Sequence, residues 1–125
     1  MVHSLKLLTF AHRGEAQTFL KNLSLKSHPD QQGLYVGDGV SVLITGEGIY
    51  ETLTSTSFAL SLLGTCTSLT NIGICGAVSR KIELHSIHKI RSVYAQDEFK
   101  SFSTNGHDNI DIITSKDRVL DQNSA

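Results

Sequence analysis

The chain has 125 residues and a formal net charge of −1, from 11 basic and 12 acidic side chains. This length predicts a single domain over residues 1–125. The well-mixed charges give no basic surface for nucleic acid and no polybasic patch for a membrane, and no apolar run reaches the roughly 20 residues of a membrane span. We therefore expect a cytoplasmic protein that binds a small molecule or another protein chain.

The first half of the chain predicts alternating strands and helices. Apolar residues at helical spacing follow the first strand and form one face that would pack on a sheet. A later helix is rich in Ser and Thr, which are mediocre helix formers, so tertiary packing must hold it. In order, we expect a strand at 5–10, a helix opening at Glu15, strands at 34–36 and 40–45 joined by a tight turn, and a helix from 49 or 50 to 63.

The segment 70–78 is an uncharged apolar run that ends in small residues. It predicts the central strand of the sheet, buried on both faces as in parallel sheets under helices. Gly73 and Gly76 would let the backbone approach a ligand or take a positive φ, or they would only let a helix pack on the sheet. A turn at 79–87, a strand at 89–95, a long loop at 96–109 and a last strand at 110–114 follow, and the tail 115–125 has no periodicity. This order is typical of a layered α/β domain with a mixed sheet.

Candidate site residues follow two of these strands. In open parallel sheets ligands bind at the carboxyl ends of the strands, where 11–15 and the Gly46-Glu47-Gly48 turn would meet. Glu15 could activate a water as a general base, or it could only favour the start of its helix. Arg13, with His12, could bind phosphate or be solvated.

No cofactor or metal is expected. Cys66 and Cys75 belong to no metal-binding motif and are interpreted as small buried hydrophobic residues. His85 and His88 are three residues apart, but they lie in a predicted strand or turn with no third ligand nearby.

Four segments in this order, 8–16, 42–48, 71–77 and 87–94, resemble the purine nucleoside phosphorylase and methylthioadenosine/S-adenosylhomocysteine nucleosidase superfamily. The resemblance implies a three-layer sandwich with a mixed central β-sheet flanked by helices. It implies that Glu15 positions the attacking water of a nucleosidase. It also implies that the substrate pocket is lined by Ala11, by the turn at Gly46 and Gly48, and by the small residues after the central strand, which are Ile74, Cys75, Gly76 and Ala77.

Members of the superfamily continue into a second half, which supplies a Met-Glu pair that grips the ribose and an aspartate that protonates the leaving purine. This chain stops at Ala125 before either, so we expect an incomplete, N-terminal part of the fold that is inactive alone. The implied function is cleavage of the N-glycosidic bond of a purine nucleoside, by hydrolysis rather than phosphorolysis, because the phosphorylase arginines are not evident. The alternative is a non-catalytic nucleoside-binding or assembly subunit. Because nucleosidase subunits lend pocket residues to each other, a homodimer or larger homo-oligomer is expected.

Overall fold

The computed structural model describes residues 5–64, 66–78, 80–95 and 100–114. Its internal contacts divide the chain into two compact units, a first unit of Met1–Ile74 and a second unit of Cys75–Ala125. The single domain expected from the length stays a prediction. None of the helices in the described ranges is long and apolar enough to cross a membrane.

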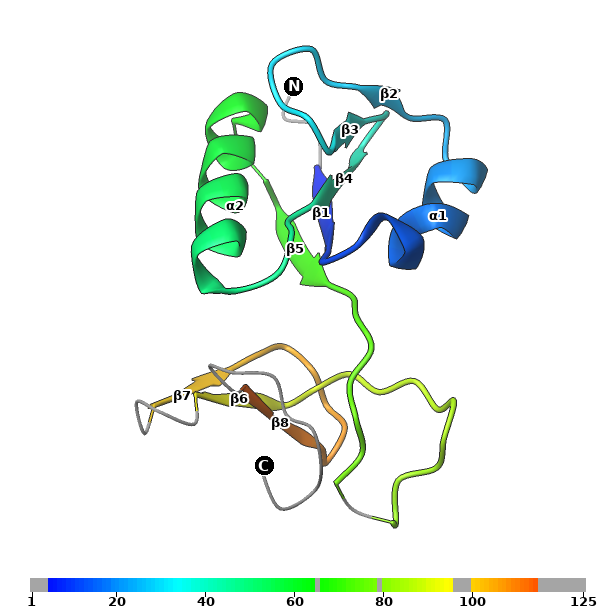
Figure 1. The fold of residues 1–125 in the computed structure, drawn as a ribbon, viewed down its shortest axis with the longest axis vertical. Coiled ribbons are helices and arrows are strands. Elements are labelled where there is room, and N and C mark those ends of the chain that lie inside the picture. The colour runs from blue at the N-terminus through cyan, green and yellow to red at the C-terminus, as the bar shows by residue number, and fades with distance from the viewer. Residues whose placement is uncertain (1–4, 65, 79, 96–99, 115–125) are drawn as a thin grey trace. The chain divides into compact units, whose positions relative to one another are not determined.

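The first unit is built on a mixed five-stranded sheet in the order β2-β3-β4-β1-β5. Strands β1, β4 and β5 run parallel to one another, while β3 pairs antiparallel with both β2 and β4. Figure 1 shows one helix on each side of this sheet. The strands are β1 (Lys6–Phe10), β2 (Lys26–Ser27), β3 (Leu34–Val36), β4 (Val40–Ile44) and β5 (Ser68–Asn71), and the helices are α1 (Arg13–Asn22) and α2 (Ile49–Leu63).

Two apolar clusters join the sheet to its helices. Neighbouring residues of a strand point to opposite faces, so Val42 packs with Phe10 and Ala16 of α1, whereas Leu43 packs with Ala59 of α2. All five of these side chains are fully buried. The two covered faces confirm the predicted layered α/β fold with a mixed sheet.

Local sequence signals place the element ends well. The tight turn before β4 is closed by a hydrogen bond from the Gly37 N–H to the Val40 carbonyl, at 2.9 Å. Helix α2 ends at Leu63 because Gly64 takes a φ of 77°, which glycine adopts without a steric penalty, and its N–H bonds the Leu60 carbonyl. The predicted hairpin and second helix are therefore confirmed.

The prediction of a doubly buried central strand within 70–78 is wrong. The strand β5 ends at Asn71, lies at the edge of the described sheet, and exposes all four of its residues. The apolar Ile74 follows the strand and is 89% exposed. Among the three parallel strands β1 is the inner one, because it has parallel partners on both sides, and it carries the buried Leu7 and Phe10.

The second unit contains a three-stranded sheet in the order β7-β6-β8, formed by β6 (Ser92–Ala95), β7 (Lys100–Ser103) and β8 (Asp111–Thr114). The strands expected near 89–95 and 110–114 are confirmed with shorter bounds. The long loop expected at 96–109 is wrong over β7, which pairs antiparallel with β6. Strand β7 is short and contains two serines, so its apolar pattern is too weak for the strand to be predicted from the sequence. Residues 96–99 and the tail 115–125 lie outside the described residues.

An ion pair connects the beginnings of β6 and β8. The Arg91 Nη2 lies 2.8 Å from the Asp111 Oδ2, and the Arg91 Nε also donates to this carboxylate. The hydrogen bond to Arg91 holds the pKa of Asp111 below its ordinary value. The carboxylate form is thus favoured when the unit is folded.

Candidate functional site

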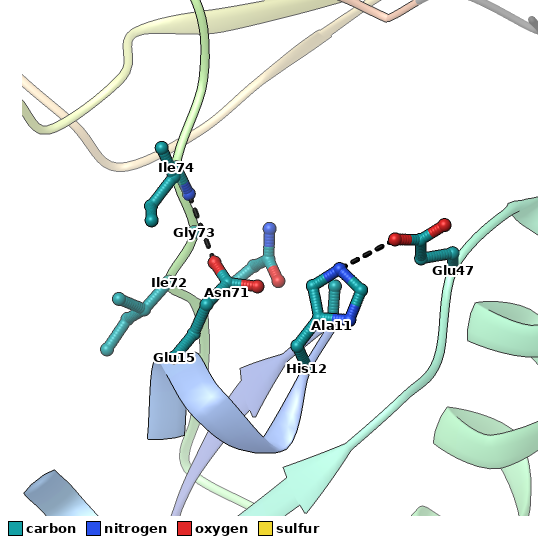
Figure 2. A pocket seen from close by; sticks show the side chains of 8 residues that line it. All are labelled: Ala11, His12, Glu15, Glu47, Asn71, Ile72, Gly73 and Ile74. Atoms are coloured by element: carbon teal, nitrogen blue, oxygen red, sulfur yellow. Dashed lines mark hydrogen bonds and ion pairs between the residues drawn. The ribbon is translucent and has the colours of Figure 1, made fainter. Parts of the chain in front are cut away.

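A pocket of about 400 Å³ lies in the first unit at the carboxyl ends of β1, β4 and β5. The segments that line it follow three parallel strands, which end at the same edge of the sheet. Figure 2 shows the lining side chains. They are Ala11, His12, Glu15, Glu47, Asn71, Ile72, Gly73 and Ile74.

Glu15 reaches this pocket from the first turn of α1, and its side chain is half-buried. The helix N-terminus stabilises its negative charge. Its Oε2 accepts a hydrogen bond from the Ile74 backbone N–H at 3.2 Å, and a Cβ placed on Gly73 would lie 3.5 Å from the same oxygen. Within the described residues, the other oxygen, Oε1, has no hydrogen-bond partner. The carboxylate is therefore oriented by the chain and keeps one oxygen for a ligand or a water.

Asn71 is held at the end of β5 by the strand beside it. The buried Thr9 hydroxyl donates to the Asn71 Oδ1 at 3.0 Å, and the Ile72 N–H donates to the Thr9 carbonyl at 2.9 Å. With its oxygen occupied, Asn71 offers its amide N–H groups to a ligand. The sequence analysis did not assign Asn71 a role, although a polar residue at the end of a strand is a usable signal.

The side chains of His12 and Glu47 meet on the pocket wall, with His12 Nε2 and Glu47 Oε1 2.6 Å apart. Glu47 stands between Gly46 and Gly48, whose φ angles are 82° and 89°. Glycine adopts such angles readily, so the two glycines build the turn that presents Glu47. The ligand contact was expected from the two glycines, whereas the pocket is lined by the glutamate between them.

The remaining predicted site residues are placed as follows. Ala11 and Ile74 line the pocket with Glu15, whereas Gly46 and Gly48 are not among the lining residues and only flank Glu47 in the sequence. Arg13 is not among the lining residues and instead donates to the Tyr35 hydroxyl at 2.9 Å, with its guanidinium 5.8 Å from the centre of that ring. Its phosphate role stays a prediction that this geometry does not favour.

Cys75, Gly76 and Ala77 are exposed and begin the second unit, so their place in a substrate pocket stays a prediction. Cys66 is half-buried against the core on the α2 side, whereas Cys75 is exposed, so the expected burial of both thiols is wrong for Cys75. Over the described part of the chain, no group of three or more His, Cys, Asp or Glu side chains could hold a metal ion.

No protein-family model and no curated protein matches this sequence. Solved structures do match the fold. MTAN from Chlamydia trachomatis aligns with a TM-score of 0.72 and 18% identity over 93% of this chain, and a D161N variant aligns with a TM-score of 0.70 over 91%. The chain has the fold of MTAN. This likeness confirms the fold that the superfamily resemblance implies.

The chain spans less than two thirds of the MTAN chains, since it covers 63% of the first of these two structures and 62% of the D161N variant. The D161N variant has also been solved bound to MTA, and that structure aligns with a TM-score of 0.70 and 18% identity. The described sheet and helices thus correspond to part of the MTAN chain.

Proposed function

We propose that the pocket of the first unit binds a purine nucleoside and that Glu15 holds a water for hydrolysis of the N-glycosidic bond. The observation that carries this proposal is the Glu15 carboxylate, which lines the pocket and is oriented by the Ile74 N–H. The MTAN fold and the binding of MTA by one MTAN structure support a nucleoside as the ligand.

In the proposed reaction, the water oxygen bonds to the anomeric carbon of the sugar as the bond from that carbon to the purine nitrogen breaks. Positive charge develops on the sugar, and the nearby Glu15 carboxylate stabilises it. The proton lost by the water passes to Glu15, which acts as a general base. The electron pair of the broken bond stays on the purine nitrogen, which must take a proton from a general acid to leave as the neutral base, and none of the residues that line the pocket is assigned that role.

Hydrolysis is favoured over phosphorolysis by the chemistry of the lining residues. Binding of a phosphate would call for cationic donors such as Arg or Lys. The residues that line the pocket include neither, and Arg13 is engaged with Tyr35. The carboxylates of Glu15 and Glu47 would repel a phosphate dianion.

We also propose that the protein assembles with copies of itself through α2, and that it does so in the cytoplasm. The helix exposes large apolar side chains and has a single charged residue, Glu51. An exposed apolar face with a single charge suits burial against an identical face. The exposed apolar residues are Ile49 at 68%, Tyr50 at 76%, Leu53 at 63% and Phe58 at 47%.

Isothermal titration calorimetry of the 125-residue chain with adenosine, inosine and methylthioadenosine tests the pocket. We expect binding of at least one nucleoside, weakened when Asn71→Ala removes an amide donor. A chain that binds none of the three refutes the proposal.

A second assay separates a catalytic chain from a nucleoside-binding subunit. It measures the release of free purine by chromatography, and we expect release only when an acid that protonates the leaving base is supplied.

A further inference from the structure

The His12–Glu47 pair is a polar feature of the pocket that hydrolysis at Glu15 does not use. Its two side chains come from different loops, which follow β1 and β4, and their nearest atoms are 2.6 Å apart. Both side chains remain accessible, at 56% and 58% exposure. A ligand in the pocket can therefore reach them.

Hydrogen bonds hold together the two loops that carry the His12–Glu47 pair. Thr45, which is 5% exposed, joins the two loops because its N–H donates to the Phe10 carbonyl at 2.8 Å. Its hydroxyl lies 2.9 Å from the Gly46 carbonyl and 3.3 Å from the Phe10 carbonyl. The Ser55 hydroxyl of α2 donates to the Thr45 carbonyl at 2.8 Å. These bonds hold together the ends of β1 and β4, from which His12 and Glu47 project. A preorganised pair loses little entropy when it binds a ligand.

The pocket has two chemically different sides. Figure 2 shows Ile72 and Ile74 on one side and Glu47 on the other, with Glu15 and Asn71 between them. A nucleoside is divided in the same way, since the flat base is largely apolar on its faces and the sugar carries hydroxyl groups. With the anomeric carbon at Glu15, a base against the isoleucines directs the sugar toward the His12–Glu47 pair.

We propose that His12 and Glu47 bind a hydroxyl of the nucleoside sugar and thereby select substrates that carry it. This inference rests on the nucleoside pocket proposed above. The hydroxyl donates to the Glu47 carboxylate, whose two oxygens together offer about four acceptor sites. The ring N–H of His12 fixes the carboxylate's orientation by donating to Oε1.

Such a pair rejects a sugar that has lost the hydroxyl or carries an apolar group in its place. The Glu47 carboxylate and the His12 ring would then lose water without gaining a partner in the sugar, which is the costly case for polar groups that become buried. Because the pair is more than half exposed, some water remains, and we expect about tenfold discrimination.

Calorimetry with adenosine and its 2′-, 3′- and 5′-deoxy analogues tests the inference on the 125-residue chain. We expect one analogue to bind the wild-type chain about tenfold more weakly than adenosine. Glu47→Ala should bind adenosine about tenfold more weakly and lose the distinction between adenosine and that analogue. The matched control is Glu51→Ala, which removes a carboxylate four residues away and outside the pocket, and it should behave as the wild type.

The outcomes separate the two proposals. Suppose that Glu47→Ala binds adenosine and that each deoxy analogue still binds it more weakly than adenosine by the same factor as it does the wild-type chain. The pair then binds no sugar hydroxyl and this inference is wrong, while the proposal of a nucleoside pocket stands. If the wild-type chain binds no nucleoside, the proposed function fails and this inference fails with it. If Glu47→Ala loses its circular dichroism signal, Glu47→Gln keeps the shape of the side chain and should reduce the penalty about threefold.

Discussion

Replacement of Glu15 by glutamine tests the proposed chemistry without disturbing the fold. Glutamine has nearly the same size, and its amide oxygen can still accept the hydrogen bond from the Ile74 N–H, now 3.2 Å long. What the substitution removes is the negative charge at the pocket. The prediction therefore concerns affinity for a positively charged sugar, which resembles the transition state of glycosidic cleavage.

The expected magnitude follows from the charge separation. Two unit charges about 4 Å apart interact by about 4 kcal/mol at an effective dielectric constant of about 20. Glu15 is half-buried in an open pocket, where water screens the interaction further. We therefore expect the Glu15 carboxylate to stabilise a bound cationic sugar by about 1.4 kcal/mol, which corresponds to a tenfold change in affinity for that ligand.

The assay is calorimetric titration with adenosine and with an adenosine analogue whose sugar ring contains a protonated nitrogen. The wild-type chain should prefer the cationic analogue by about tenfold. Glu15→Gln should bind adenosine within about threefold of the wild type but lose this preference, whereas the matched control Glu51→Gln should retain it. If Glu15→Gln keeps the preference for the cation, Glu15 only favours the start of its helix, and the general-base proposal is wrong.

Three further predictions concern stability and assembly. Phe10→Ala should lower the free energy of unfolding by about 3–5 kcal/mol in urea titrations, because the ring is fully buried 5.1 Å from that of Phe19; a loss below about 1 kcal/mol would contradict this packing. Since the pKa of Asp111 is lowered on folding, its contribution to stability is present above the unfolded value of about 3.9 and is lost as the pH falls through the folded value. Melting followed by circular dichroism from pH 5 to pH 2 should show this loss, and Asp111→Asn should show less of it; equal loss in both chains would exclude Asp111 as the cause. Leu53→Glu should convert an oligomer to a monomer in light scattering while leaving unfolding within about 0.5 kcal/mol of wild type, and a wild-type chain that is already monomeric would refute assembly through α2.

Much of the fold could be predicted because its signals are local. Apolar residues at helical spacing identify α1, and Gly64 marks the end of α2 because glycine readily takes the φ of 77° found there. The hairpin before β4 depends on a short glycine-containing turn. These features require only neighbours in the chain, so the sequence alone indicates them.

The position of a strand within the sheet could not be read in this way. An uncharged apolar run predicts burial, yet β5 lies at the edge of the described sheet and Ile74 is exposed. Burial depends on what covers a strand, and that covering comes from residues distant in sequence. The short strand β7 was missed for a related reason, since its pairing with β6 defines it better than its own side chains do.

By itself, the sequence determined that the chain alternates strands and helices, that Glu15 and the turn at 46–48 follow strands that end at a common edge, and that the fold resembles the nucleosidases. Only the tertiary structure decided which side chains meet there. Glu15 bonds Ile74 across 59 residues of sequence, and Thr9 bonds Asn71 across 62. The parallel register of β1 with β4 and β5 brings these distant residues together, and it depends on pairing between strands that lie far apart in the sequence.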